Sequence, residues 1–309
     1  MIRRPGLLSA ALLLLAPAVL RAQAGSPPPL PPAPRPAWSR QPVPLDDRRL
    51  PEASGVVVSR SQPGVLWSFN DSDNPPELFA TDTAGRALGR WTVAGAQNED
   101  WEAMTLGPGD CAGRPCLFIG DIGDNDAKRR AVTIYRVPGP TVAPGWRSDR
   151  DDTVPALARL VVRYPDGPHD AESLFADSTG DLYIITKPRV TWPELFRIPR
   201  AAWGRRDTVL ATTVDTLHID PRSGIENWVT DAALAPDGRT VAVRTYGYLY
   251  LYSRAADGRL TPLAPWPRCL LAGLGAQGEG IGWLDPTTFV LTSEKFLMFP
   301  ASVAVARCP

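Results

Sequence analysis

Histidine is nearly absent from this chain, which has 2 histidines in 309 residues. A zinc site built from several histidines is therefore excluded, and a Ser-His-Asp triad has little material. The sequence also has no Gly-x-Ser-x-Gly segment and no glycine-rich phosphate loop ending in lysine. Any hydrolytic chemistry would have to come from carboxylates and a metal-activated water.

The chain also has no excess of basic over acidic residues. Lysine and arginine together number 33, as do aspartate and glutamate, so the formal net charge is zero. Because there is no basic tract, nucleic acid is a poor candidate partner. No second long apolar run follows the first twenty residues, so we expect no membrane span. A small polar or anionic ligand is the expected partner, and we expect a monomer.

The first residues resemble an export signal rather than part of a fold. Arg3 and Arg4 precede an apolar run over 7–20, and Ala22-Gln23-Ala24 fits the small-x-small rule for cleavage. We interpret 1–24 as a Sec-type signal peptide, which predicts a periplasmic or secreted protein. The proline-rich segment 25–42 is expected to be a stiff, extended linker. Residues 43–309 then form a single domain.

The four cysteines fit an oxidising compartment. Cys111 and Cys116 flank a short turn between two apolar segments and could clip it. A bridge between Cys269 and Cys308 would tie the C-terminal tail to the body of the domain. Three pairings are possible, and free thiols are a further alternative.

A short pattern recurs along the chain: an acidic residue, then small residues, then an apolar strand. The anchors are about 50 to 70 residues apart, a period typical of radially repeated sheets. They are Glu52, Glu102, Glu172, Asp231 and Glu279. We predict an all-β propeller of five four-stranded blades, closed by an N-terminal strand around Val43–Leu50 that joins the last blade. Six blades remain open, because 203–220 and 254–273 do not resolve into clear strands.

These blade motifs give the chain a family resemblance. The Glu279-Gly280-Ile281 start, the similar starts at Glu102 and Glu172, and Asp-Gly turns such as Asp237-Gly238 resemble bacterial secreted propellers. The families concerned are the phytase-like, SMP-30/gluconolactonase-like and NHL-like propellers. The resemblance covers roughly residues 43–309 and implies the fold more strongly than it implies an activity.

In a propeller the first strand of each blade lines the central channel, so the acidic anchors would gather near one axis. Carboxylates brought together need a neutralising partner, and Ca²⁺ takes six to eight oxygen ligands. Two loops after second strands, 70–74 and 120–125, are also rich in Asp and Asn, although turn chemistry alone would explain them. The predicted Ca²⁺ ligands are Glu52, Asp71, Asp124, Asn125, Asp231 and Glu279.

A second ring is expected at the ends of the second strands. It contains Asn70 or Asp71, Asp121, Lys187, Arg244 and Glu294. Lys187 and Arg244 could hold an anionic ligand, with Asn70 and Trp101 beside it. The same side chains could instead form a network of salt bridges that locks the blades together, and the tryptophan could pack between blades.

Three functions remain open at this level. The first is a secreted or periplasmic propeller that binds Ca²⁺ and a polar ligand at its acidic mouth. The second is a metal-dependent hydrolase of phosphate esters or lactones, with Glu102, Asp121 and Glu172 as the catalytic carboxylates. His169 is a further candidate base, or an incidental turn residue. The third is a protein-interaction scaffold, which an exposed apolar patch would favour.

Overall fold

A computed structural model describes residues 33–111, 113–143, 145, 151–263, 269–271 and 277–308. These residues belong to one compact unit, Pro32–Pro309. The predicted signal peptide 1–24 and the linker residues 25–32 lie outside the described residues. No helix in the described ranges is long and apolar enough to cross a membrane.

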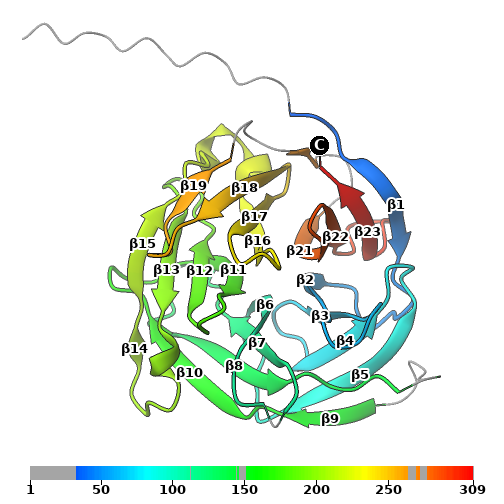
Figure 1. Cartoon of the computed structure of the whole chain (residues 1–309), viewed down its shortest axis with the longest axis horizontal. Helices are drawn as coiled ribbons and strands as arrows, with labels where there is room; N and C mark the ends of the chain where they lie inside the picture. Colours follow the sequence, from blue (N-terminus) through cyan, green and yellow to red (C-terminus); the bar gives the residue numbers. More distant parts are fainter. Residues whose placement is uncertain are drawn as a thin grey trace, which may run out of the picture. The chain divides into compact units, whose positions relative to one another are not determined.

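Five mainly antiparallel sheets are arranged in a ring around a central axis, which confirms the predicted five-bladed propeller (Figure 1). Blade 1 consists of β2 (Ala53–Val58), β3 (Leu66–Asn70), β4 (Glu77–Thr81) and β5 (Ala87–Ala94). Blade 2 consists of β6 (Trp101–Gly107), β7 (Cys116–Asp121), β8 (Val132–Pro138) and β10 (Ala158–Arg163). Blade 3 consists of β11 (Ala171–Ala176), β12 (Leu182–Thr186), β13 (Glu194–Ile198) and β15 (Thr212–Thr216). Blade 4 consists of β16 (Val229–Leu234), β17 (Thr240–Thr245), β18 (Tyr248–Arg254) and β19 (Leu260–Pro262).

Blade 5 is made from both ends of the domain. It consists of β21 (Gly278–Asp285), β22 (Thr288–Ser293), β23 (Ser302–Arg307) and β1 (Ala37–Pro44). The closing strand β1 pairs antiparallel with β23, as predicted, but it lies earlier in the chain than the expected Val43–Leu50. It ends at Pro44, and proline is tolerated there because β1 is an edge strand. Ring closure by the two ends leaves β23 without a free edge.

Three short strands were not expected from the sequence. β9 (Asp151–Pro155) adds to blade 1 parallel to β5, and β14 (Val209–Leu210) adds to blade 2 parallel to β10. β20 (Cys269–Leu270) pairs with β18. The segment 203–220, which left a sixth blade open, supplies β14 and β15.

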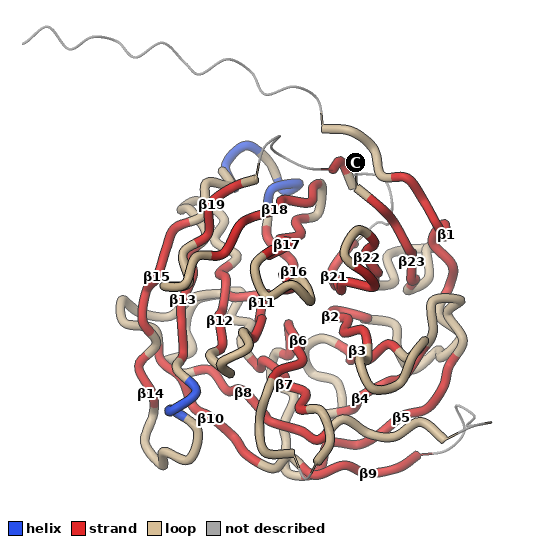
Figure 2. The backbone as a smooth tube through the Cα atoms, viewed as in Figure 1, coloured by secondary structure: helices blue, strands red, loops and turns tan. Residues whose placement is uncertain are grey.

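The remaining described segments are turns and short helices. Three 3₁₀ helices of three residues each are drawn in blue in Figure 2: η1 (Arg200–Ala202), η2 (Pro221–Ser223) and η3 (Ile225–Asn227). The connection from β22 to β23 ends before Ser302, and Phe296 and Phe299 close a tight turn within it.

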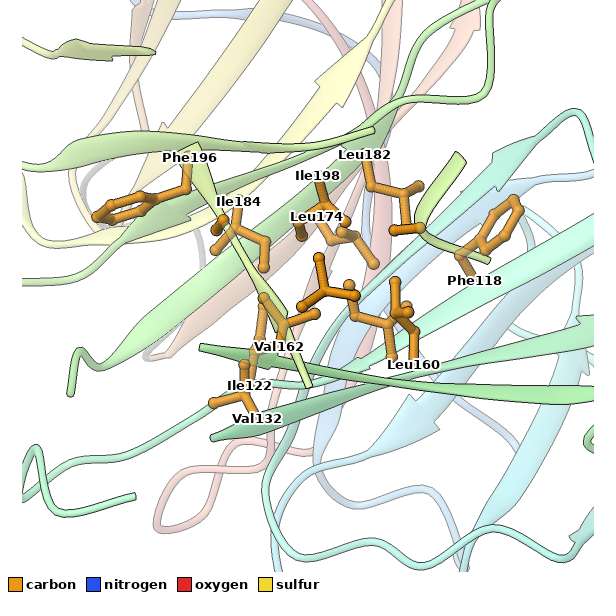
Figure 3. Close-up of a cluster of buried hydrophobic side chains, with 14 of the residues drawn as sticks. Phe118, Ile122, Val132, Leu160, Val162, Leu174, Leu182, Ile184, Phe196 and Ile198 are labelled. Atoms are coloured by element: carbon orange, nitrogen blue, oxygen red, sulfur yellow. The ribbon is translucent and has the colours of Figure 1, made fainter. Parts of the chain in front are cut away.

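The hydrophobic core is divided into five clusters, each between two neighbouring blades. Figure 3 shows the cluster between blades 2 and 3, where Phe118 and Leu160 belong to one sheet and Leu174, Ile184 and Phe196 to the other. A strand such as β12 is buried at all five positions because both of its faces are covered. Each fully buried Leu, Ile or Phe side chain contributes about 1.5–3 kcal/mol. The blades are therefore held by packing against each other.

Both expected disulfides are present. Cys111 bonds Cys116 across the turn, and Cys269 bonds Cys308 with the two Cα atoms 5.6 Å apart. The second bridge links β20 of blade 4 to the residue that follows β23 of blade 5. It therefore fastens the C-terminal end next to the ring closure.

Candidate functional site

Each innermost strand carries a β-bulge close to its start. In blade 2, Trp101 pairs with Asp121 and Ala103 with Gly120, so Glu102 is the extra residue. The other blades show a shift at the same place. The residue after the first pair is Ser54, Glu102, Glu172, Thr230 and Glu279 in blades 1 to 5. Bulges re-aim side chains and are common beside active sites.

A backbone hydrogen bond repeats beside every bulge. The N–H of the first residue after the second strand donates to the carbonyl that lies two residues before the bulge residue, with N···O distances of 2.9–3.2 Å. The pairs are Asp71 with Glu52, Ile122 with Asp100, Lys187 with Asp170, Tyr246 with Trp228, and Glu294 with Gln277. The five blades therefore share one register, with three equivalent positions in each.

These three positions collect carboxylates at one end of the channel. We call the set the axial acid cluster. It comprises Glu52, Asp71, Asp100, Glu102, Asp170, Glu172, Glu279 and Glu294. Blade 4 contributes none, because it has Trp228, Thr230 and Tyr246 at these positions. The cluster is therefore lopsided around the axis.

Glu52 and Asp231 do not share the position of the other three predicted anchors. Glu52 lies two residues before the bulge residue of its blade, and Asn74 Nδ2 donates to its Oε2 at 2.5 Å. Asp231 lies one residue after Thr230. Its carboxylate accepts the N–H groups of Ala232 and Ile281, at 2.7 and 2.8 Å. Asp231 therefore links blades 4 and 5.

Three members of the cluster come closest to a metal-ligand arrangement. Asp71, Asp100 and Glu102 each have a carboxylate oxygen within 4.8 Å of the others. Gly123 makes room for them, because a Cβ at that position would lie 2.4 Å from Asp100 Cγ and 2.7 Å from Glu102 Oε1. All three ligand atoms are oxygens, which suits a hard cation.

The environment of this trio favours protonated carboxyls when no cation is bound. Burial raises the pKa of Glu102 well above its usual value, and the neighbouring Glu172 raises it further. Burial and the charges of Asp71 and Asp170 raise the pKa of Asp100 to about 7. The pKa of Asp71 is also raised, mainly by burial. A bound cation would reverse these directions, since it stabilises the ionised form.

Lys187 neutralises another part of the cluster. Its ammonium donates to Glu172 Oε1 at 2.7 Å and to the Tyr246 hydroxyl at 3.2 Å. Burial lowers the pKa of Lys187, but Glu172 and Glu279 outweigh it and leave that pKa well above normal. Burial raises the pKa of Glu172 to about 8 despite the opposing effect of Lys187. Oε2 of the buried Glu279 has no hydrogen-bond partner among the described residues.

The Arg244 guanidinium is buried and hydrogen-bonded to backbone carbonyls of the neighbouring blade. Its Nη1 donates to the carbonyls of Gly280 at 2.5 Å and Thr292 at 2.7 Å. The side chain is buried, and burial lowers its pKa to about 10. Nη2 lies so close to Gly278 that a Cβ there would be 2.1 Å away. This position supports the alternative in which Arg244 braces blades 4 and 5.

Asp121 and Asp124 belong to a neighbouring network centred on Arg129. Asp121 Oδ1 accepts from Arg129 Nη2 at 2.7 Å and from the Asp100 N–H at 3.1 Å. Asp124 Oδ2 accepts the N–H of Arg129, while the Asp124 N–H donates to Asp170. Asn125 accepts from Arg189 at an exposed position. These residues hold the loop 121–129 in place beside the trio.

Asn70 and Trp101 have structural contacts as well. Asn70 donates to the Arg49 carbonyl at 2.7 Å and accepts the Glu52 N–H at 3.0 Å. Trp101 is fully buried, packs edge-on against Phe69 and donates its indole N–H to the Gln97 carbonyl. Because it is buried, Trp101 offers no face for a ligand to stack on, and the interpretation as packing fits its place.

Sequence reasoning missed Asp100 and Tyr246. The signal for Asp100 was a repeated Asp-x-Glu at the start of the innermost strand, in Asp100-Trp101-Glu102 and Asp170-Ala171-Glu172. Tyr246 stands one residue after β17, equivalent to Lys187, and only the register reveals it.

The opposite ends of the innermost strands carry few charges. A cavity of about 270 Å³ there is lined mainly by apolar residues of the five innermost strands.

No protein-family model matches the sequence, and no curated protein matches it. Solved structures with a similar fold include a calcium-binding regucalcin from Agrobacterium tumefaciens, with 13% identity, 90% of this chain and 96% of that chain covered, and a TM-score of 0.46. A gluconolactonase from Xanthomonas campestris has 11% identity, coverage of 91% and 99%, and a TM-score of 0.39. An α-L-arabinofuranosidase from Podospora anserina has 10% identity, coverage of 90% and 98%, and a TM-score of 0.49. Such similarities concern the propeller fold, which hosts many unrelated functions.

Proposed function

We propose that the axial acid cluster binds a divalent cation, Ca²⁺, and through it a small polar ligand, in an exported propeller. The observation that carries this proposal is the convergence of Asp71, Asp100 and Glu102 within 4.8 Å. The two disulfides agree with an oxidising compartment. Lys187 only partly offsets the charge of this trio. It lowers the pKa of Glu102 and Asp71, but its ammonium is bonded to Glu172, and burial still leaves both pKa values raised.

The donor set fits Ca²⁺ for two reasons. Ca²⁺ prefers oxygen ligands and accepts carboxylates in flexible geometry. Three buried or half-buried acids within one ion's reach also lose most of their mutual repulsion when a cation lies between them. Asp71, Asp100 and Glu102 would hold the ion, which would leave other coordination positions for a ligand's oxygens. Glu279, another member of the axial acid cluster, has a side-chain oxygen without a hydrogen-bond partner among the described residues, and the charge of Asp71 raises its pKa.

The test is Ca²⁺ titration of EDTA-treated protein by calorimetry, together with thermal unfolding. Ca²⁺ should raise the melting temperature, because an ion at about 100 times its Kd adds about 2.7 kcal/mol to folded-state stability. Glu102→Gln should abolish this response. Glu99→Gln is the matched control, because Glu99 is a neighbouring acid whose side chain is 67% exposed. Equal Ca²⁺ responses in Glu102→Gln and the wild type would contradict the proposal.

A metal-dependent hydrolase is the second candidate function, favoured by Glu172. This predicted catalytic carboxylate is not one of the proposed cation ligands, its charge acts on the ligand Glu102, and Lys187 donates to its Oε1. When bound, a cation would supply Lewis-acid chemistry. Turnover of p-nitrophenyl phosphate or of a lactone that is lost with EDTA and in Glu102→Gln would support this function. Cation binding without turnover of any such substrate would leave the binding function alone.

One specific observation favours the third candidate function, a protein-interaction scaffold. Four consecutive apolar residues, 296–299, are exposed at the tip of the β22–β23 connection, and Met298 is 87% exposed. Exposed apolar groups of this kind are found at protein contacts. Sedimentation of the wild type and of a Leu297→Ser, Met298→Ser variant would reveal self-association through this tip.

A further inference from the structure

A second group of metal-ligating side chains lies on blade 3, outside the axial acid cluster. His169 and Asp166 stand on the connection between β10 and β11, and Glu194 is the first residue of β13. His169 Nε2 lies 2.9 Å from Asp166 Oδ1 and 3.6 Å from Glu194 Oε2. One imidazole nitrogen is therefore shared by two carboxylates.

These distances agree with the edges of a coordination tetrahedron. Zinc binds imidazole nitrogen at about 2.0–2.1 Å and carboxylate oxygen at about 2.0–2.2 Å, so two ligand atoms of a tetrahedral site lie about 3.3–3.5 Å apart. The two measured separations lie on either side of that range. The three ligand atoms all lie within 4.8 Å of one another. The two separations from His169 Nε2 are each within a few tenths of an ångström of a tetrahedral edge.

The His169 ring and the backbone of Glu194 are held in place by their surroundings. The His169 ring packs edge-on against Tyr164, with ring centroids 5.1 Å apart, and lies 5.3 Å from Phe196. The backbone N–H of Glu194 donates to Thr186 Oγ1 at 2.9 Å. The ligand atoms remain accessible, since the side chains of His169 and Glu194 are 21% and 28% exposed. Prepositioned ligands that solvent can reach are what binding of a free ion requires.

A neutral histidine alone satisfies this arrangement less well than an ion does. A neutral imidazole with its proton on Nε2 donates one hydrogen bond, and here the better partner is Asp166. Glu194 is then left beside another carboxylate, which is unfavourable. We propose that Asp166, His169 and Glu194 form a second metal site, which takes a borderline ion such as Zn²⁺ and keeps one coordination position open to water.

The composition of the chain makes this site easy to test. His169 and His218 are its two histidines, and all four cysteines are in disulfides, so no thiolate competes for zinc. The experiment is titration of untagged, EDTA-treated protein with Zn²⁺ by calorimetry, and with Co²⁺ by visible absorption, which reports tetrahedral coordination. The variants are His169→Gln and the matched control His218→Gln, whose ring lies against Trp192.

We expect stoichiometric Zn²⁺ binding in the wild type and in His218→Gln. In His169→Gln the affinity should fall by at least the roughly 10- to 100-fold that even outer partners of a metal ligand are worth. Glu194→Gln should weaken binding as well. Unchanged Zn²⁺ affinity in His169→Gln, or no Zn²⁺ binding by the wild type, would overturn the proposal.

The two proposed sites can be separated in the same experiments. His169→Gln should keep the Ca²⁺ response of the wild type, because imidazole is not among the axial ligands. Zn²⁺ binding that disappears in Glu102→Gln but persists in His169→Gln would place the ion at the axis and overturn the second site.

Discussion

At the scale of single residues, Lys187 and Gly123 control how much negative charge the axis can hold. Lys187 supplies a buried ammonium to Glu172, and Gly123 supplies space for Asp100 and Glu102. Lys187 acts through its charge, and Gly123 acts through the absence of a side chain. Substitution of Lys187 should therefore change stability in a pH-dependent way, whereas substitution of Gly123 should weaken Ca²⁺ binding.

Lys187→Met should destabilise the protein strongly. Removing one partner of a buried ion pair costs about 3–5 kcal/mol when the other charge is left uncompensated, so the loss should be largest where Glu172 is ionised, at and above its pKa of about 8. Low pH should reduce the loss, since Glu172 can then take up a proton. Urea unfolding at pH 5 and pH 8 measures the effect. Lys128→Met, at an exposed pair with Asp126, is the control and should change nothing. Equal losses in both variants would contradict a special role for Lys187.

Gly123→Ala should displace the carboxylates that we assign to Ca²⁺. The new Cβ would lie 2.4 Å from Asp100 Cγ, so the loop or the acids must move. We expect a cost of about 1–3 kcal/mol, as for other overpacked sites, and a weaker Ca²⁺ response. Gly139→Ala, whose nearest neighbour is a carbonyl oxygen at 3.2 Å, should keep that response. Calorimetry measures the Ca²⁺ affinity of both variants. A wild-type affinity in Gly123→Ala would contradict the proposal that Gly123 makes space for the Ca²⁺ ligands.

At the scale of elements, bulges and bridges decide where the strands of the ring begin and end. The bulge lies at the same place in each innermost strand, so Thr230 occupies in blade 4 the position of Glu102 in blade 2, and Asp231 lies one residue beyond it. The disulfide Cys269–Cys308 holds the last strand against its neighbour blade. The disulfide Cys111–Cys116 closes only a turn.

The two disulfides should differ in their effect on stability. In the chain-entropy model the closed loop of 39 residues is worth about 4 kcal/mol and the loop of 5 residues about 2 kcal/mol. A Cys269→Ser, Cys308→Ser variant should therefore melt lower than a Cys111→Ser, Cys116→Ser variant. Differential scanning calorimetry of the two double variants tests the order. The reverse order would mean that the turn, rather than the ring closure, limits unfolding.

At the scale of the whole molecule, the propeller concentrates acids from four blades around one axis. Burial and mutual repulsion raise the pKa of Asp100 to about 7 and that of Glu172 to about 8, both above their unfolded values. The folded protein thus binds these protons more tightly than the unfolded chain does. The stabilisation is complete below about pH 4 and is lost as the pH rises through about 7 to 8.

Metal-free protein should therefore become less stable between about pH 5 and pH 8, and Ca²⁺ should flatten this dependence. Acids with a lowered pKa, such as Asp82 and Asp177, act below this window. Melting temperatures measured across the window, with EDTA and with excess Ca²⁺, give the comparison. A melting temperature that rises with pH in EDTA would show that the axial acids are already neutralised.

The repeated strand starts and turns were enough to predict an all-β propeller of five blades, and both disulfides were anticipated from the places of their cysteines. Local alternation and spacing carry such information, because every blade must bury its faces against its neighbours. The site was less accessible. Glu102, Glu172 and Glu279 could be found from the repeat, and the repeated Asp-x-Glu could have pointed to Asp100, whereas Tyr246 could not be placed without the register.

Two features of the molecule were decided only by the tertiary structure. One is which acidic side chains belong to the axial acid cluster. A bulge decides which side chain of an innermost strand faces the axis, and a bulge depends on cross-strand pairing that the sequence of a single strand does not encode. The other is the meeting of Asp166, His169 and Glu194, since the last comes from a different strand of the blade. The sequence by itself determined the ring and its repeat, and packing between strands determined which charged groups share a site.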